Sequence, residues 1–187
     1  MNNRCFLQIA LLLCFSTTTL SFSHKLLALQ QSNSILKCQE LLMQLNGRPE
    51  DCLNDMMDFK IPEEIKHPEQ FQKEHAAFVT YEMLQNIYAL FTRGFSNPGW
   101  NETIVKDLLV GLHQQMDLLE TALEEKLGEG NIHWGNSMTT LRLKSYYWRI
   151  LRYLKAKEFS SCAWTVVQSE LFRNFSFINR LADDFQS

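Results

Sequence analysis

Three cysteines outside the N-terminal segment, Cys38, Cys52 and Cys162, are the residues whose type and spacing point most directly to chemistry. In an oxidising compartment, three thiols allow one disulfide and leave one thiol free. Cys38 lies in the apolar stripe of a predicted helix, Cys52 lies in a proline-flanked connection, and Cys162 begins the last predicted helix. A loop cysteine and a helix-start cysteine can join without distorting a helix, so the sequence favours Cys52–Cys162. The alternatives, 38–52 and 38–162, would pull a core thiol off its stripe.

Catalysis would need a constellation of reactive groups, and the sequence holds no glycine-rich phosphate loop, GxSxG, HExxH or CxxC motif. Glu64 and His67 form one ExxH, the spacing of di-iron helical bundles, but those proteins use two such motifs and two further glutamates. Pro68 follows directly and argues against a helix there. An apolar setting would also raise the pKa of the Cys38 thiol and make it a poor nucleophile. We therefore predict no catalytic residue, no metal and no cofactor.

Two sequons predict glycosylation, at Asn101 and at Asn174. Asn101 follows a proline and glycine turn at the start of a predicted helix, where a glycan would be exposed. Asn174 lies within the last predicted helix, three residues after Leu171 and four before Ile178. It therefore borders the buried stripe of that helix, which makes it the poorer acceptor.

A basic stretch between Arg142 and Lys157 carries interleaved aromatic residues, a combination found in nucleic-acid-binding proteins. At helical spacing, the same residues are better explained as an apolar stripe with a solvated basic rim. A heparin-like polyanion is the alternative partner. The formal net charge of −3 gives the chain no general attraction to nucleic acid or anionic lipid.

The first 21 residues have the layout of a secretory signal peptide, with Arg4 before an apolar run from Phe6 to Phe15. That run is too short to cross a bilayer, which needs about 20 apolar residues. Cleavage after Ser21 would leave residues 22–187 as one secreted domain without membrane insertion. With 7 glycines, 4 prolines and 45% hydrophobic residues, the chain should form an ordered domain with few turns.

Apolar residues recur at helical spacing along most of the remaining chain, and no comparable run alternates with period two. The pattern predicts an all-α fold of five helices, within residues 25–45, 71–91, 101–127, 138–157 and 160–181. Asn46-Gly47-Arg48-Pro49 ends the first helix and begins a long connection to about Gln70. Such a connection is typical of growth-hormone and cytokine bundles. A helical carrier of a small apolar ligand is the competing class, but its core stripes should be interrupted by small residues.

Several segments of the sequence resemble the type I interferon family. They are LLMQLNGRPEDCL (41–53), IPEEIK (61–66), YEMLQNIYALF (81–91), GWNETIV (99–105) and YLKAKEFSSCAWTVV (153–167). The resemblance implies a five-helix cytokine bundle that binds both chains of a two-chain cell-surface receptor. It also implies signalling through Janus kinases and STAT transcription factors, which produces an antiviral and antiproliferative state. We expect the cytokine itself to be a monomer.

In that family, the connection after the first helix and the last helix bind the high-affinity receptor chain. The outer faces of the second, third and fourth helices meet the other chain. Leu53, Asp55 and Arg173 match the family pattern and are expected to bind receptor. The chain departs from the family at Met56 and Gln168, where arginine is usual. Two further departures are Ser169, where a small apolar residue is usual, and Met43, in place of a tryptophan.

Overall fold

The structure is a computed structural model that describes residues 33–45, 47–94, 99–127 and 138–183. Its long helices are residues 33–43, α2 (Lys73–Gly94), α3 (Glu102–Leu127), α4 (Met138–Ala156) and α5 (Ser161–Asp183). None of the described residues lies in a strand, and none of the described helices is long and apolar enough to cross a membrane. The prediction of an all-α bundle is confirmed. The predicted signal peptide, residues 1–21, lies outside the described residues.

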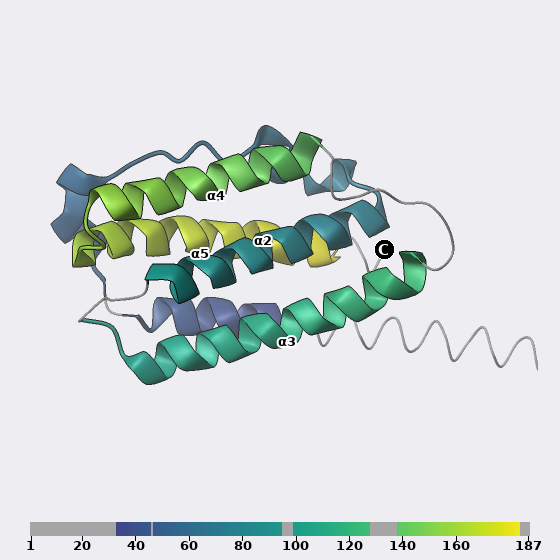
Figure 1. The fold of residues 1–187 in the computed structure, drawn as a ribbon, viewed down its shortest axis with the longest axis horizontal. Coiled ribbons are helices and arrows are strands. Elements are labelled where there is room, and N and C mark those ends of the chain that lie inside the picture. Colours follow the sequence, from purple (N-terminus) through teal and green to yellow (C-terminus); the bar gives the residue numbers. More distant parts are fainter. Residues whose placement is uncertain (1–32, 46, 95–98, 128–137, 184–187) are drawn as a thin grey trace, which may run out of the picture.

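The first helix and α5 run antiparallel to each other along one side of the bundle (Figure 1). In the middle of the first helix, Gln39 Oε1 accepts a hydrogen bond from Asn179 Nδ2 at 3.1 Å. Beyond its end, Gln168 Nε2 donates to the carbonyl oxygen of Leu45 at 2.8 Å. The chain therefore leaves the first helix at the end of the bundle where α5 begins, and must return along the whole bundle before α2 starts (Figure 1).

The returning segment contains three short 3₁₀ helices, η1 (Pro49–Asp55), η2 (Glu63–Lys66) and η3 (Pro68–Gln70). The sequence predicted an irregular connection here, and the structure adds these short turns to it. Pro49 and Pro68 each occupy the first turn of a 3₁₀ helix, where a missing N–H costs nothing. Phe59 and Ile65 are completely buried, so the connection is anchored in the core rather than lying loosely over it.

Helix α2 packs against α3, α4 and α5. Buried apolar residues spread over a wide face of this helix, including Val79, Leu84 and Phe91, allow it to meet all three neighbours. Near the end of α2, Phe91 stacks on Trp164 of α5 with ring centroids 5.5 Å apart, and Trp100 lies 5.4 Å from the same ring. This aromatic cluster joins the end of α2, the start of α3 and the start of α5 in one core.

Cys38 is the free cysteine of the described chain, and its side chain is buried between the first helix and α3. Burial raises the pKa of the Cys38 thiol to about 12, so the thiol stays protonated at neutral pH. A Cβ atom added to Gly111 of α3 would lie only 2.8 Å from Cys38 Sγ. Glycine therefore allows the two helices to approach closely at this point.

We expect Gly111→Ala to lower the free energy of unfolding by about 1–3 kcal/mol, because the new methyl group must displace the Cys38 sulfur. In a Cys38→Ala background the sulfur is gone, and the same substitution should raise the free energy of unfolding by about 0.5–1 kcal/mol through helix propensity. Urea denaturation of the four proteins in this cycle measures both effects. Equal effects of Gly111→Ala in the two backgrounds would show that the Cys38 sulfur is not the cause of the destabilisation.

Candidate functional site

The disulfide between Cys52 and Cys162 attaches the first part of the connection to the start of α5, with the two Cα atoms 5.3 Å apart. It confirms the pairing that the sequence favoured. Cys52 is buried within η1, and Cys162 lies at the first turn of α5. The crosslink closes a separation of 110 residues. It holds η1, at the beginning of the connection, against α5.

Asp55 and the residues after it are held by α4. Tyr153 Oη donates a hydrogen bond to the carbonyl oxygen of Asp55 at 2.8 Å, and Lys157 Nζ lies 2.8 Å from Asp55 Oδ1. Burial and the Asp55 carboxylate together raise the pKa of Tyr153 to about 12, so Tyr153 remains a donor at neutral pH. The Tyr153 ring also packs edge-on against Phe59. Asp55 is therefore largely committed to contacts within the molecule.

Arg149 of α4 fixes the middle of the connection. Its Nε donates to the carbonyl oxygen of Phe59 at 3.0 Å, and its Nη2 donates to that of Lys60 at 2.8 Å. Lys60 has a φ of 56°, in the left-handed region, and both its backbone N–H and its ammonium group donate to Asp58. These hydrogen bonds compensate for a backbone conformation that a non-glycine residue rarely adopts.

Farther along the connection, Arg142 pairs with Glu64 at 3.2 Å, and Arg180 of α5 lies 3.7 Å from Glu69. Glu64 and His67, the ExxH pair, are thus engaged separately, because His67 Nδ1 lies 3.2 Å from Glu69. No group of three or more potential metal ligands occurs within the described ranges. Contacts from α4 and α5 therefore secure the connection from η1 to η3.

The secured connection presents apolar side chains outward. Leu53 is 69% exposed, and Met56 and Met57 are also largely exposed. On α5, Phe172 and Arg173 are exposed as well. The disulfide and the packing of η1 against α5 place these residues of the connection beside α5. We call this surface, defined by Leu53, Met56, Met57, Phe172 and Arg173, the connection–α5 surface.

Arg173 also has a role beneath that surface. Its Nη2 lies 3.1 Å from Oε2 of Glu170, a carboxylate that is only 4% exposed. Glu170 Oε1 accepts a hydrogen bond from Tyr146 Oη at 2.6 Å. Asn174 Nδ2 donates to the same Tyr146 oxygen at 2.7 Å, and Tyr147 Oη donates to Asn174 Oδ1 at 2.6 Å. Burial raises the pKa of both tyrosines, so the two hydroxyls remain protonated donors in this cluster.

Asn174 cannot hold these partners and carry a glycan. Its side chain is completely buried, and its Nδ2 also donates to the carbonyl oxygen of Glu170 at 2.8 Å. A sugar attached at Nδ2 would have to occupy the space between α4 and α5. The prediction of glycosylation at Asn174 therefore conflicts with the packing of the folded chain. The spacing from Leu171 to Ile178 indicated a position beside the stripe, but not the hydrogen bonds that draw the amide inward.

Gln168 is likewise turned inward rather than toward a partner. Its Nε2 donates to the carbonyl oxygens of Leu42 and Leu45 at 2.7 and 2.8 Å, which satisfies the end of the first helix. A Cβ on Gly47 would lie 2.8 Å from Gln168 Oε1 and 2.7 Å from Thr165 Oγ1. The glycine lets the chain leave the helix close against α5. Sequence comparison with a family pattern places Gln168 in the last helix but cannot reveal this capping role.

An interferon alpha/beta domain model matches residues 27–185 of the chain. Interferon beta of Macaca fascicularis and interferon beta of Homo sapiens are each 60% identical to it over 181 residues, 97% of each chain. The chain belongs to the interferon alpha/beta family. The solved structure of zebrafish interferon 2 is 24% identical, covers 80% of this chain and 97% of its own, and superposes with a TM-score of 0.63. That likeness shows the same helical fold.

Membership of this family makes the chain a type I interferon, and type I interferons are cytokines rather than enzymes. The three residues expected from the family pattern occupy different environments. Leu53 projects into solvent, Arg173 is exposed but pairs with Glu170, and Asp55 is held by Tyr153 and Lys157. Phe172, which the sequence analysis did not select, is exposed next to Arg173. The sequence did contain one indication of this exposure, because Phe172 lies between Leu171 and Phe175, which belong to the buried stripe, and is not itself part of that stripe.

Replacing both disulfide cysteines of this interferon with serine should lower the free energy of unfolding by about 2–5 kcal/mol, because the crosslink restricts the unfolded chain over a long loop. Urea denaturation of the double variant Cys52→Ser/Cys162→Ser measures the loss. Cys38→Ala is the matched control, since it removes one thiol without removing the crosslink and should cost about 1 kcal/mol. Equal unfolding midpoints for the two variants would contradict a stabilising role for the crosslink.

Proposed function

We propose that this interferon is secreted, binds both chains of the type I interferon receptor and triggers Janus kinase–STAT signalling that leads to an antiviral state. The connection–α5 surface is the proposed site for the high-affinity chain. The observation that carries this proposal is that a disulfide and the α4 contacts hold exposed apolar groups of the connection beside exposed groups of α5. Preorganised apolar groups next to a charged residue are what a protein interface needs at its centre.

The second receptor chain is proposed to bind the outer faces of α2, α3 and α4. Those faces lie away from the first helix, which packs between α3 and α5, and they carry exposed apolar groups including Val110, Leu141 and Trp148. Two separate surfaces on a single monomer would let one molecule bring two receptor chains together. Signalling then depends on both contacts, whereas initial capture depends mainly on the tighter one.

The proposed function is tested by an antiviral reporter assay on cells of the species that encodes the chain, with purified mature protein. Induction at low concentration that a receptor-blocking antibody abolishes would support it. No induction from a folded sample with an intact disulfide would contradict it. The same assay in cells that lack either receptor chain separates receptor-dependent signalling from any other route.

Leu53→Ala should weaken binding to the high-affinity receptor chain by about 5–30-fold, as expected for truncation of a central apolar contact worth about 1–2 kcal/mol. Because Leu53 is exposed, the substitution should leave the unfolding midpoint unchanged. Surface plasmon resonance with each purified receptor ectodomain measures the effect. Val110→Ala on α3, another exposed aliphatic truncation, is the control and should leave this affinity unchanged. An unaltered dissociation constant for Leu53→Ala would remove Leu53 from the interface.

Of the two sequons, we propose that Asn101 carries a glycan and Asn174 does not. Asn101 is exposed, and its Oδ1 accepts a hydrogen bond from the Thr103 backbone N–H at 2.9 Å, which leaves Nδ2 toward solvent. Thr103→Ala should therefore remove one enzymatically releasable glycan from protein secreted by mammalian cells. Ser176→Ala, which abolishes the other sequon without altering Asn174, should leave the mass of the glycoprotein otherwise unchanged. Intact mass spectrometry before and after deglycosylation distinguishes these results.

A further inference from the structure

The basic residues of α4 and the turn after it fall into two groups. Arg142, Arg149 and Lys157 bind the connection, at Glu64, at the carbonyls of Phe59 and Lys60, and at Asp55. The other cationic residues of α4 are Lys144, Arg152 and Lys155, and all three are exposed. At 3.6 residues per turn, Lys155 lies about 20° around the helix from Lys144, and Arg152 about 80°. The three residues therefore form a band within about one quarter of the helix surface, about 16 Å long at 1.5 Å per residue.

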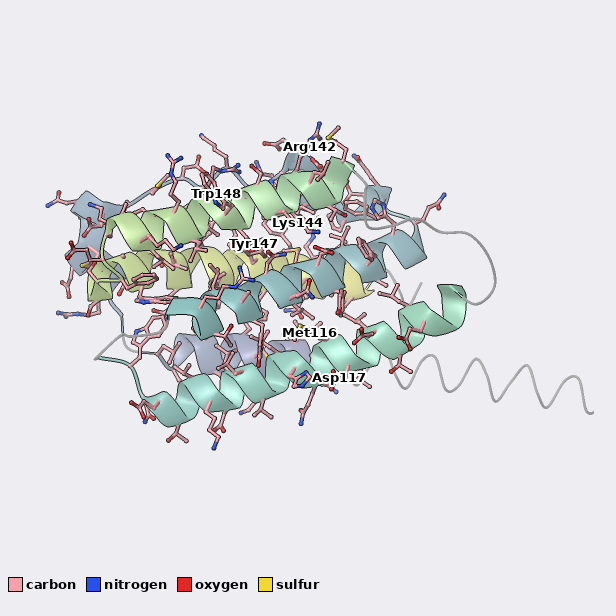
Figure 2. All side chains as sticks on the ribbon, viewed as in Figure 1. Met116, Asp117, Arg142, Lys144, Tyr147 and Trp148 are labelled. Atoms are coloured by element: carbon pink, nitrogen blue, oxygen red, sulfur yellow. A yellow bond between two sulfur atoms is a disulfide. The ribbon has the colours of Figure 1, made fainter. Side chains whose placement is uncertain are left out.

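The band borders a pocket of about 160 Å³ between α2 and α4. Arg93 and Lys144 line it from opposite helices, together with Asn86, Ala89, Leu90, Tyr147, Trp148 and Leu151. Figure 2 shows Lys144 and Tyr147 on the side of α4 that is turned toward α2. Arg152 lies over the Trp148 ring, 5.1 Å from its centroid, which holds the indole beside the pocket. We call Arg93, Lys144, Trp148, Arg152 and Lys155 the basic groove.

The cations of the basic groove are available for a ligand. Among the residues that the structure describes, Arg93, Lys144, Arg152 and Lys155 make none of the ion pairs that occupy their neighbours on α4. The carboxyl group of Glu82 in α2 interacts electrostatically with Lys144, but it is only 7% exposed, and burial raises its pKa. The surface is thus locally cationic on a chain whose net charge is −3.

We infer that the basic groove binds a sulfated linear polysaccharide of the extracellular matrix. A linear polyanion with regularly spaced sulfates matches cations that follow one another along a single helix face. The exposed Trp148 ring offers an apolar face for the C–H surface of a sugar, beside a pocket large enough for a sulfate group. The groove lies on the faces of α2 and α4 that are proposed for the second receptor chain, and Trp148 belongs to both surfaces, but the inference rests on the cations and the pocket alone.

The test uses the full mature protein and a heparin-derived octasaccharide, with binding measured by calorimetry and by Trp148 fluorescence. The triple variant Arg93→Gln/Lys144→Gln/Lys155→Gln should raise the dissociation constant at least tenfold at 0.15 M salt. By analogy with counterion release from DNA, it should also reduce the slope of log affinity against log salt by roughly one for each cation removed. Trp148→Phe should abolish the fluorescence change while leaving the protein folded.

Two controls keep the result specific. Lys37→Gln/Lys106→Gln removes two exposed lysines from the first helix and α3, and should leave octasaccharide binding unchanged. Fully desulfated heparin should not bind. Equal weakening by the control variant, equal binding of desulfated heparin, or unaltered binding by the triple variant would each overturn the inference. If the triple variant keeps octasaccharide binding but loses a purified receptor ectodomain, the groove is a protein interface and the inference is likewise overturned.

Discussion

The attachment of the long connection to α4 and α5 is the constraint on which the rest of this interferon depends. The first helix ends where α5 begins, so the chain between residue 43 and Lys73 must travel the length of the bundle outside any long helix. Their backbone groups need partners when they lie against the core. Arg149 and Tyr153 supply those partners at Phe59, Lys60 and Asp55, and the disulfide fixes the starting point. Without them, the apolar side chain of Leu53 would have no fixed position.

The basic residues of α4 and of the turn after it fall into two groups with different roles, and the sequence alone does not distinguish the groups. Helical spacing alone predicts a basic rim on α4, and it would allow every arginine and lysine of that rim to lie in solvent. The structure shows that Arg142, Arg149 and Lys157 hold the connection, whereas Lys144 and Lys155 are exposed and do not contact it. Exposed ion pairs contribute little individually. Arg149 should matter more, because its partners are backbone carbonyls of a segment with few other hydrogen-bonding options.

The sequence predicted the elements and the crosslink well because both follow from local rules. Helical periodicity located the four long helices from α2 to α5 to within a few residues, and the setting of Cys38 in a stripe left Cys52 and Cys162 to pair. The environments of Asn174 and Gln168 could not be predicted in the same way. Each depends on a residue far away in the sequence, Tyr147 for Asn174 and the Leu45 carbonyl for Gln168. Periodicity gives the face of a helix but not the partner across it.

Arg173 illustrates why a surface residue of such a bundle is hard to assign to one role. Its guanidinium group is exposed on the connection–α5 surface, yet it pairs with Glu170, which is buried and bonded to Tyr146. Truncating Arg173 would leave that carboxylate with one partner fewer, and a buried charge that loses a partner destabilises the fold. A loss of receptor binding in Arg173→Ala would therefore combine a missing contact with a disturbed cluster. Leu53 makes no comparable buried pair, so an effect of its truncation reports on the surface itself.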